Sequence, residues 1–454
     1  MNAFDLMVIG TGSGLDVASD AAEKGLSVAV VEEGPFSGTC HNRGCIPSKM
    51  LIHSADVMET IRTSDRFGIN ASVQSVDWPG IMRRVFTDID EEAAEIEEAN
   101  RSNPNITVFK GSGQFTGPKT LEVNGESIGA ETVLIAAGTR PMVPPIDGLD
   151  SVPYMTSDEA LRLTEQPESM IIVGGGYIAA EMAHFYGAMG TDVTIVNRGA
   201  NLLRMQDHQI SRRFTEVAQS KFDVRLHSQI LSVAPDGNGV RMEMSTNGGA
   251  NTLVADKLLL ATGRISNADR LQVQNSGVEV DGRGFVSTNE YLETNVPGVW
   301  ALGDIVGRYL LKHSANLEAA YVGHNMFNPD NQVAVDYNAM PASVFSSPQV
   351  ASVGITEQEA EKTGTHYVAA TYDYSETAYG ASILDLDGFV KVLADPETRE
   401  ILGCHIIGTH AAMLIQEVAN AMRMHLTTDA VTQSIYVHPA LPEVVQRAFG
   451  ELEL

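Results

Sequence analysis

Residues 6–14 read Leu-Met-Val-Ile-Gly-Thr-Gly-Ser-Gly, a short apolar run that breaks at a glycine turn. The segment 15–24 has the pattern of a helix, and the apolar run at 28–31 predicts a second strand that ends at Glu32. A strand, a glycine turn, a helix and a strand in this order are typical of a dinucleotide-binding fold. The glycines let the backbone approach a pyrophosphate at the start of the helix.

A second unit of the same kind begins at residue 170. An apolar run at 170–173 precedes the turn Gly174-Gly175-Gly176, a helical segment that includes 181–186, and an apolar run at 193–196 that ends at Asn197. One glycine motif is a weak signal, but two in the same strand and helix context are much stronger. The sequence therefore predicts an α/β fold with two Rossmann-like domains.

The C-terminal part of the chain has a different pattern. Apolar runs at 350–353, 389–393 and 401–407 are followed by an amphipathic helical segment at 411–424. Strands grouped with one long helix predict a separate α+β domain. Between the two glycine turns we expect an acidic helix at 88–100.

The composition narrows the classes of protein and of partner. With 454 residues and 43% hydrophobic residues, the chain is long enough for several cores. The excess of 58 acidic over 30 basic residues gives a net charge of −28, which argues against a nucleic-acid partner. No apolar run reaches the roughly 18 residues of a membrane helix and the N-terminus lacks the basic flank of a signal peptide. We therefore expect a soluble, cytoplasmic protein without a membrane partner.

The acidic excess carries a second expectation. Only nine of the 30 basic residues are lysine. A large acidic charge with little lysine keeps a protein hydrated in concentrated salt, where charge repulsion is strongly screened. We interpret the composition as salt-adapted. The alternative is an acidic protein of an ordinary cytosol, in which the charge serves solubility alone.

Four residues of the first unit are candidate nucleotide contacts. Gly10 and Gly12 would line the pyrophosphate, and Gly14 completes the turn. Leu15 replaces the third glycine of the usual pattern, which predicts a slightly larger distance between helix and strand. Glu32 follows Gly10 by 22 positions, a suitable spacing for a carboxylate that accepts hydrogen bonds from a ribose.

The second unit carries different chemistry at the corresponding strand end. Asn197 follows Gly174 by 23 positions and is followed by Arg198 and, further on, Arg204. A carboxylate there would repel a 2′-phosphate, whereas an uncharged residue flanked by guanidinium groups would accept it. The second unit is therefore predicted to prefer NADPH to NADH. Solvated loop arginines without a ligand are the alternative.

The sharpest signal is the run Gly-Thr-Cys-His-Asn-Arg-Gly-Cys-Ile-Pro-Ser-Lys at residues 38–49. Cys40 and Cys45 lie beside a dinucleotide fold, where a disulfide between them could be reached from a bound ring system. Pro47 suits the first turn of a helix, and a thiolate near a helix N-terminus has a lowered pKa and is a good nucleophile. The alternative is a pair of buried, inert thiols.

Cysteine usage bears on the redox compartment and on metals. Three cysteines cannot form a disulfide scaffold for this length, which fits a reducing cytosol. Cys404 lies in a strand-like run and is expected in the core. Because Cys404, His405 and His410 lack a fourth ligand nearby in the sequence, no metal is predicted.

His438 and Glu443 form a candidate acid–base pair near the C-terminus. The sequence His-Pro-Ala-Leu-Pro-Glu at 438–443 places a carboxylate five residues from an imidazole, and its two prolines restrict the backbone. Such a carboxylate can orient the ring and stabilise its protonated form. A surface histidine without function is the alternative.

Over essentially its whole length the chain resembles the class I flavoprotein disulfide reductases, which include glutathione, mycothione and mercuric reductases and dihydrolipoamide dehydrogenase. The motifs that carry the resemblance are the G-x-G opening at 10–12, the cysteine run at 38–49, G-G-G-Y-I at 174–178 with Glu181, A-T-G-R at 261–264, A-L-G-D at 301–304 and His438-Pro439.

The resemblance implies a domain organisation. It predicts an FAD-binding domain at 1–145 and 268–335, an NAD(P)-binding domain at 146–267 and an α+β dimerisation domain at 336–454. It also implies an obligate homodimer with shared active sites.

The resemblance also implies roles for single residues. Glu32 would bind the adenosine ribose of FAD. Lys49, paired with Glu181, would lie near the flavin. Cys45 would exchange electrons with the flavin, and Cys40 would attack the substrate disulfide, whose leaving thiolate would be protonated by His438 of the other chain.

Further glycines complete the predicted cofactor sites. The remaining residues expected at FAD are Gly138, Gly303 and Asp304. The residues expected at NADPH are Gly174, Gly176, Asn197, Arg198, Arg204 and Gly263.

Several members of the family compete as the nearest match. The run Leu-Lys-His-Ser-Ala-Asn at 311–316 and the segment around Asn197 look most like mycothione reductase. The salt-adapted composition favours instead a bis-γ-glutamylcystine reductase of a halophilic archaeon, which is the predicted activity. Dihydrolipoamide dehydrogenase with NAD, or a mycothione, glutathione or mercuric reductase, are alternatives, although the chain lacks the C-terminal cysteine pair of mercuric reductase. A flavin-binding scaffold with inactive cysteines is the alternative from another class.

Overall fold

The computed structural model describes residues 2–246 and 248–454. The chain divides into two compact units. Unit 1 consists of Met1–Met50, Pro79–Met142 and Gly263–Tyr337. Unit 2 consists of Leu51–Trp78, Val143–Thr262 and Asn338–Leu454. The predicted domain boundaries at residues 145, 267 and 335 remain a prediction.

Unit 1 is built on a sheet with the strand order β3-β2-β1-β6-β5-β4, and β17 pairs with β6. Neighbouring strands run parallel from β3 to β6 and between β6 and β17, whereas β5 is antiparallel to both β6 and β4. These strands are β1 (Asn2–Ile9), β2 (Val28–Glu32), β3 (Ile106–Lys110), β4 (Gly113–Gly117), β5 (Thr120–Val123), β6 (Glu126–Ile135) and β17 (Val299–Ala301). The first predicted strand–turn–helix–strand unit is confirmed.

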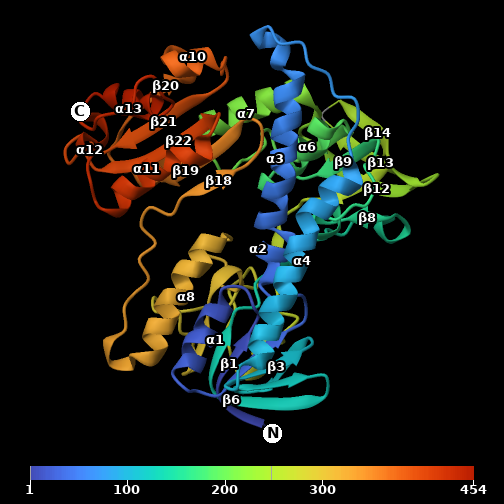
Figure 1. Cartoon of the computed structure of the whole chain (residues 1–454), viewed down its shortest axis with the longest axis vertical. Helices are drawn as coiled ribbons and strands as arrows, with labels where there is room; N and C mark the ends of the chain where they lie inside the picture. Colours follow the sequence, from blue (N-terminus) through green and yellow to red (C-terminus); the bar gives the residue numbers. More distant parts are fainter. Residues whose placement is uncertain (1, 247) are drawn as a thin grey trace. The chain divides into compact units, whose positions relative to one another are not determined.

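Helices cover the sheet of unit 1. Helix α1 (Gly14–Glu23) buries Val17, Ala18 and Ala21 in the same core as the β1 residues Leu6 and Val8. Helix α8 (Lys312–Phe327) lies beside α1 (Figure 1). A small antiparallel pair, β7 (Thr139–Pro141) and β16 (Arg264–Ser266), joins two distant segments of this unit.

The cysteine run forms helices α2 (Gly38–Arg43) and α3 (Cys45–Arg62). The division between the two units falls within α3, after Met50, and again at the start of α4 (Trp78–Ser102). Helix α4 contains the predicted acidic helix 88–100 and begins ten residues before it. The prediction missed that first part because Trp78, Val85 and Phe86 interrupt the acidic pattern.

Unit 2 contains the second parallel sheet, with the strand order β11-β10-β9-β15-β8. Its elements are β8 (Tyr154–Met155), α5 (Ser157–Ala160), β9 (Ser169–Val173), α6 (Tyr177–Met189), β10 (Asp192–Val196), α7 (His208–Lys221), β11 (Asp223–Arg225) and β15 (Lys257–Leu260). The second predicted Rossmann-like unit is confirmed. An antiparallel sheet that the sequence analysis did not predict lies between β11 and β15. It consists of β12 (Gln229–Asp236), β13 (Gly239–Thr246) and β14 (Gly249–Ala255).

The C-terminal segment of unit 2 forms an antiparallel sheet with the order β18-β19-β22-β21-β20. Its elements are β18 (Ala342–Val344), β19 (Gln349–Gly354), α9 (Glu357–Thr363), β20 (Val368–Asp373), α10 (Ala378–Ser382), β21 (Phe389–Ala394), β22 (Ile401–Gly408), α11 (Ala411–Arg423), α12 (Asp429–Thr432) and α13 (Glu443–Gly450). One core contains side chains of β19, β21, β22, α11 and α13, among them Cys404. The predicted α+β domain and the buried position of Cys404 are confirmed.

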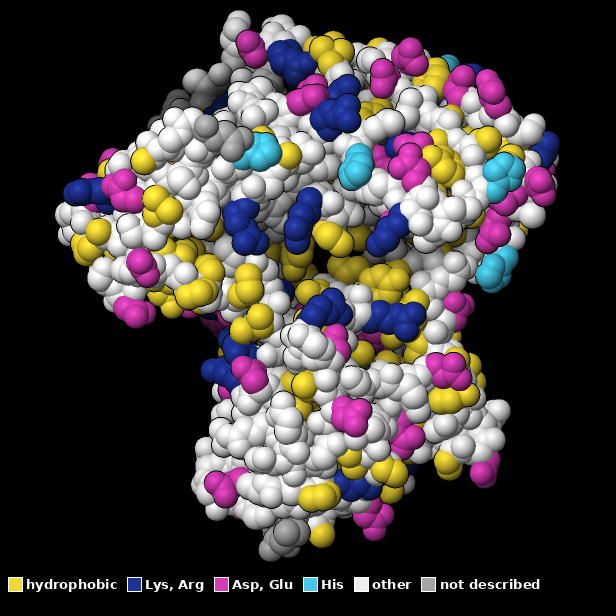
Figure 2. Space-filling view, turned by 180° about the vertical axis from the view of Figure 1, so that it is seen from behind, with side chains coloured by type: hydrophobic (Ala, Val, Ile, Leu, Met, Phe, Trp, Pro, Cys, Tyr) yellow, Lys and Arg dark blue, Asp and Glu magenta, His cyan; other side chains and the backbone are white. Residues whose placement is uncertain are grey.

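The surface reflects the acidic composition. On the face drawn in Figure 2, aspartate and glutamate side chains are scattered rather than gathered in one patch. Helices in the described ranges are all too short or too polar to cross a bilayer.

Candidate functional site

The first glycine turn leaves no room for side chains toward the sheet. Gly10 has a φ of 102°, and a Cβ there would overlap the carbonyl oxygen of Ala136. At Gly12 the opposite holds, because no heavy atom of the protein lies within 4 Å of an added Cβ. The backbone of Gly12 therefore faces open space at the start of α1, which is where a pyrophosphate would be held.

Gly14 corrects one detail of the sequence analysis. A Cβ at this first residue of α1 would lie 3.0 Å from the side chain of Val8 on β1 and 2.9 Å from that of Ala136. The close approach of helix and strand is thus made at Gly14, and the larger distance predicted from Leu15 is wrong.

Glu32 is the last residue of β2, and three hydrogen bonds hold its carboxylate in place. Its Oε2 accepts hydrogen bonds from the backbone N–H (2.9 Å) and the hydroxyl (2.6 Å) of Thr11, and its Oε1 accepts one from the N–H of Gly34 (2.7 Å). Since an ionised carboxylate has roughly four acceptor positions, these donors leave capacity for a ribose hydroxyl. The side chain is 9% exposed.

Asp304 is, with Glu32, the second carboxylate of unit 1 that the sequence analysis expects at FAD. Burial raises its pKa, while a hydrogen bond from the Thr139 hydroxyl (2.9 Å) and the charge of Arg264 act in the opposite direction. Its neighbour Gly303 donates its N–H to the buried carboxylate of Glu318 (2.5 Å). Gly138 has a φ of 62° and open space at its Cβ position.

The residues of unit 1 fit FAD. Gly12 and Gly138 provide positions at which a Cβ would project into space unoccupied by protein atoms, and Glu32 has acceptor capacity for a ribose. The partly buried carboxylate of Asp304 accepts a hydrogen bond from Thr139 and has acceptor positions for further donors. A flavin dinucleotide supplies both hydroxyl donors and an anion for these groups.

Cys40 and Cys45 lie together beside the glycine turn. A Cβ at Gly38, the first residue of α2, would lie 2.8 Å from the Cα of Gly12. The third residue of that helix is Cys40, and Cys45 is the first residue of α3. Both cysteines are thiols in the structure, and the two side chains are hydrogen-bonded to each other. The prediction that they form a redox pair remains a prediction, but they have the required proximity.

The pKa of Cys40 differs from the expectation of a lowered value. The hydrogen bond with Cys45, burial and the charge of Cys45 raise the pKa of the Cys40 thiol far above its ordinary value, and the ammonium of Lys312 opposes the shift. The helix argument considered a single thiolate near a helix N-terminus and left out the second thiol, and two adjacent thiolates repel each other.

Lys312 is a residue that the sequence analysis quoted without giving it a role. It begins α8, and its Nζ lies 2.8 Å from the Ser13 hydroxyl in the glycine turn. It therefore adds a positive charge near both the dinucleotide turn and Cys40. The sequence offered one signal for this role, because lysine is unusual in the first turn of a helix and Lys312 follows shortly after Gly303-Asp304.

Lys49 and Glu181, predicted to pair, belong to different units. Lys49 lies on α3 in unit 1 and donates a hydrogen bond to Ser48 Oγ (3.3 Å). Glu181 lies on α6 in unit 2, is buried, and accepts a hydrogen bond from the N–H of Phe345 (3.0 Å). Their pairing remains a prediction.

The second glycine turn repeats the constraints of the first. Gly174 has a φ of 131°, and a Cβ there would overlap the carbonyl oxygen of Ala261. Gly176 caps α6 and has open space at its Cβ position. Gly263, the remaining glycine predicted at the nucleotide, is assigned to unit 1.

Asn197 and the two arginines lie in the loop between β10 and α7. The Asn197 amide donates hydrogen bonds to the carbonyl oxygens of Gly199 (3.3 Å) and Asn201 (3.0 Å). Arg198 and Arg204 are exposed and make no ion pair with any residue in the described ranges. Two guanidinium groups without a carboxylate partner suit an anionic ligand.

His438 and Glu443 form the predicted contact. The His438 Nδ1 lies 2.9 Å from Glu443 Oε1, and Glu443 Oε2 accepts a hydrogen bond from the N–H of Ala440 (3.0 Å). The hydrogen bonds from Ala440 and His438 lower the pKa of Glu443. The imidazole is 72% exposed, so its other nitrogen is accessible to solvent.

Two family models match the chain. One, described as pyridine nucleotide-disulphide oxidoreductase, matches residues 4–325, and the other, the dimerisation domain of the same family, matches residues 340–449.

Curated relatives and solved structures agree with these matches. Mycothione reductase of Mycobacterium tuberculosis is 42% identical over 99% of both chains. Glutathione reductase of Burkholderia cepacia is 32% identical over 97% of both chains, and dihydrolipoyl dehydrogenase of Bacillus subtilis is 32% identical over 98% of this chain and 97% of its own. The HOCl-induced flavoprotein disulfide reductase RclA from Escherichia coli superposes with a TM-score of 0.87 at 26% identity, covering 98% of this chain and 99% of its own. The chain belongs to the pyridine nucleotide-disulphide oxidoreductase family, whose members are FAD- and NAD(P)H-dependent enzymes.

Proposed function

We propose that this protein is an NADPH-dependent flavoprotein reductase of a low-molecular-weight thiol disulfide, with bis-γ-glutamylcystine as its substrate. The observation that carries the proposal is the contact between the Cys40 and Cys45 side chains beside the first glycine turn. Thiol–disulfide exchange needs two sulfurs that can form a bond with each other, and a bound flavin at this turn could reduce them.

FAD would be held by Gly10, Gly12, Glu32, Gly138 and Asp304. When bound, it supplies the two-electron carrier between the nicotinamide and the internal disulfide. The nicotinamide nucleotide would be held at Gly174 and Gly176, with Arg198 and Arg204 at its 2′-phosphate. The protein's contribution is to place these groups and to control the protons at its own thiols.

The cysteines carry the exchange chemistry. Two electrons and two protons convert the Cys40–Cys45 disulfide into the dithiol. Because its pKa is raised, Cys40 first passes its proton to a base, for which we propose His438 of the second subunit, and then attacks one sulfur of the substrate, forming a mixed disulfide and expelling a thiolate. Cys45 attacks the Cys40 sulfur, which releases the second thiol and restores the internal disulfide. The net reaction is NADPH + H⁺ + RSSR → NADP⁺ + 2 RSH.

His438 is the proposed proton donor to the expelled thiolate. Its Nδ1 contact with Glu443 fixes the ring and leaves Nε2 for the proton transfer. The lowered pKa of Glu443 keeps that carboxylate ionised across the neutral range. We place His438 in the active site of the second subunit of a homodimer, a proposal supported by the dimerisation-domain match.

Two observations bear on the substrate. The acidic composition, with 58 acidic and only 30 basic residues, supports a salt-adapted enzyme and hence bis-γ-glutamylcystine. The full-length similarity to mycothione reductase favours mycothiol disulfide as a second candidate. Both are disulfides of cysteine derivatives, so the same exchange chemistry applies.

The expected cytoplasmic location stays a prediction.

A substrate comparison tests the proposal. The kcat/KM values of bis-γ-glutamylcystine, mycothiol disulfide, glutathione disulfide and lipoamide are measured at high salt with NADPH and with NADH. Bis-γ-glutamylcystine with NADPH is expected to give the highest value. Mycothiol disulfide as the best substrate would establish the second candidate, and lipoamide with NADH as the best pair would overturn the proposal.

The scaffold alternative requires a separate measurement. A flavoprotein with inactive cysteines would bind FAD and leave every disulfide unreduced. Cys45→Ser should abolish disulfide reduction while FAD stays bound. If wild type and Cys45→Ser reduce disulfides at the same rate, the cysteine mechanism is wrong.

A further inference from the structure

A buried ionic cluster connects the nucleotide loop of unit 2 with its C-terminal sheet. The Lys391 cluster consists of Lys391, Asp207, Glu357 and Gln358. Lys391 lies within β21 and is 1% exposed, and its Nζ is 2.9 Å from each carboxylate oxygen of Asp207 and 2.6 Å from Glu357 Oε2. Burying a cation is unfavourable unless anions compensate it, so a lysine inside this apolar strand calls for an explanation.

Asp207 receives donors from both sides of the cluster. It is the N-cap of α7, where its Oδ1 accepts a hydrogen bond from the N–H of Gln209 (2.9 Å). Its Oδ2 accepts one from the N–H of Glu357 at the start of α9 (3.1 Å). Burial alone would raise the pKa of Asp207, but Lys391 and the Gln209 N–H hold it below its ordinary value. The carboxylate is therefore ionised and fixed.

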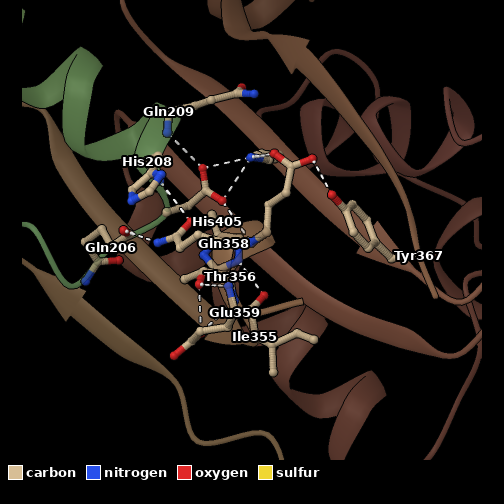
Figure 3. Close-up of polar contacts among 12 residues, drawn as sticks. Gln206, His208, Gln209, Ile355, Thr356, Gln358, Glu359, Tyr367 and His405 are labelled. Carbon is tan, nitrogen blue, oxygen red and sulfur yellow. Dashed lines mark hydrogen bonds and ion pairs between the residues drawn. The ribbon is translucent and has the colours of Figure 1, made fainter. Parts of the chain in front are cut away.

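Gln358 holds the residues on either side of Asp207. Its Nε2 donates a hydrogen bond to the carbonyl oxygen of Gln206 (3.0 Å), and its Oε1 accepts one from the N–H of His208 (3.3 Å), as Figure 3 shows. Three consecutive residues of the nucleotide-binding part thus depend on side chains from the C-terminal segment.

Residues 206–208, which are held by these contacts, end the loop between β10 and α7 that carries Arg198 and Arg204. Leu203 donates its N–H to the carbonyl oxygen of Gly175 in the glycine turn (2.6 Å), and Arg204 is the next residue. The N–H of Gln206 returns to the carbonyl oxygen of Leu203 (2.9 Å). Arg204 therefore lies between two anchors, the glycine turn on one side and the Lys391 cluster on the other.

We propose that the Lys391 cluster positions Arg204, and through the same loop Arg198, for the 2′-phosphate of NADPH. The inference rests on the proposed function, because it takes these arginines as the phosphate ligands. An exposed guanidinium gains affinity and selectivity when its backbone is fixed before binding. A buried ion pair is also screened much less by salt than an exposed one, so the anchor would persist in concentrated salt.

The test uses two ligands that differ by one phosphate. 2′,5′-ADP and 5′-AMP are titrated into the full-length holoenzyme by calorimetry. The variant is Lys391→Met with Asp207→Asn and Glu357→Gln, because removal of the lysine alone would leave two carboxylates without their cation, and asparagine still caps α7. The Kd of 2′,5′-ADP should rise about 10-fold, the loss of one well-oriented charged contact, and that of 5′-AMP should change less than about 2-fold. The KM for NADPH should rise with kcat unchanged.

Two further variants keep the outcome decisive. Arg399→Met with Asp429→Asn removes an exposed ion pair of the same segment (2.8 Å) and should change neither Kd. Gln358→Ala removes no charge. If the Lys391 cluster variant does not fold, Gln358→Ala decides the question, with an expected rise of about 3-fold in the Kd of 2′,5′-ADP. Equal weakening of both ligands, or no change in either, would overturn the positioning inference.

Failure of the inference is distinguishable from failure of the proposed function. If wild type binds 2′,5′-ADP no better than 5′-AMP, the NADPH assignment is wrong and the inference is wrong with it. If wild type discriminates and Arg204→Ala abolishes the discrimination, but the cluster variants retain it, the NADPH assignment stands and only the positioning inference is wrong.

Discussion

The two glycine turns share a backbone and differ in the chemistry at the end of the following strand. In unit 1, Glu32 presents a carboxylate that is held by Thr11 and Gly34, residues of its own dinucleotide unit. In unit 2, Asn197 presents an amide and is followed by arginines whose loop is anchored by a lysine 184 positions away from Asp207. In the proposed function, the shared fold holds a dinucleotide at each turn, and a few side chains at the strand end decide which one is accepted.

Alanine in the glycine turns should have the largest effect. Gly10→Ala and Gly174→Ala each force a side chain onto a carbonyl oxygen at positive φ, so each should lower the free energy of unfolding by about 3 kcal/mol or more. Gly10→Ala should also abolish FAD binding, whereas Gly174→Ala should keep FAD and lose the nicotinamide nucleotide. Urea unfolding and cofactor content measure both.

Gly12→Ala and Gly176→Ala are the matched controls for these variants. Both added methyl groups meet no protein atom within 4 Å, so stability should change by less than about 1 kcal/mol while the respective ligand is lost. A turn whose two alanine variants lose the same stability would not have the open space that we assign to the ligand.

Removal of the arginines should have the next largest effect and acts on unit 2 alone. Arg198→Ala with Arg204→Ala should raise the KM for NADPH about 100-fold, because two charge-assisted contacts to a phosphate are lost. The KM for NADH should change less than about 3-fold. Steady-state kinetics with both nucleotides measures this, and equal changes for NADPH and NADH would show that the arginines are structural.

An exchange of the strand-end residues tests the comparison directly. Asn197→Asp introduces a carboxylate beside the 2′-phosphate and should lower kcat/KM for NADPH about 10-fold while that for NADH is unchanged or higher. Glu32→Gln removes the charge in unit 1 and should weaken FAD binding about 10-fold. An Asn197→Asp enzyme that still prefers NADPH as strongly as wild type would contradict the account.

The smallest expected effect is a pH dependence that distinguishes the partly buried Asp304 of unit 1 from the buried Asp207 of unit 2. Burial raises the pKa of Asp304 in unit 1, whereas the pKa of Asp207 in unit 2 is lowered. A raised carboxyl pKa stabilises the fold at acidic pH, and this contribution is lost as the pH rises through the folded-state pKa. Asp304→Asn should therefore stabilise the FAD-free protein at neutral pH, by about 1 kcal/mol, with little effect near pH 4.

Asp207→Asn should show the opposite sign. A lowered pKa contributes stability above the ordinary value, and this is lost only as the pH falls through the folded-state pKa. The variant should be less stable than wild type at neutral pH and approach it in acid. Chemical unfolding between about pH 2 and pH 8 measures both variants, because the Asp207 contribution is lost only below the ordinary carboxyl pKa. A change of the same sign in both variants at neutral pH would contradict the assignment.

Most of the fold could be predicted from local patterns. The strands around both glycine turns and the C-terminal strands with their helix follow from apolar runs and turn residues that are contiguous in the chain. The sheet β12–β14 was missed although Val240, Met242 and Met244 alternate as buried residues. Its other positions are mostly polar or partly exposed, so no continuous apolar run marks these strands in the sequence.

The site was predictable only where its residues form motifs. The cysteine run and the His438–Glu443 contact are local in sequence, so the spacing predicts that the two side chains of each pair lie in the same region. The raised pKa of Cys40 depends on how close the second thiol lies, which the spacing does not determine. The Lys391 cluster joins residues that are far apart in the chain. In the sequence, a lysine inside the apolar run of β21 indicated only that this side chain would need an anionic partner, and not which one.

Counting thiols before and after reduction tests the central claim most directly. The air-oxidised holoenzyme is treated with one equivalent of NADPH per chain, alkylated and analysed by peptide mass spectrometry. Alkylation should appear at Cys40 and Cys45 only after NADPH is added, while Cys404 is unaffected. If NADPH is consumed and the alkylation of these two residues does not change, electrons do not reach this pair and the proposed mechanism is wrong.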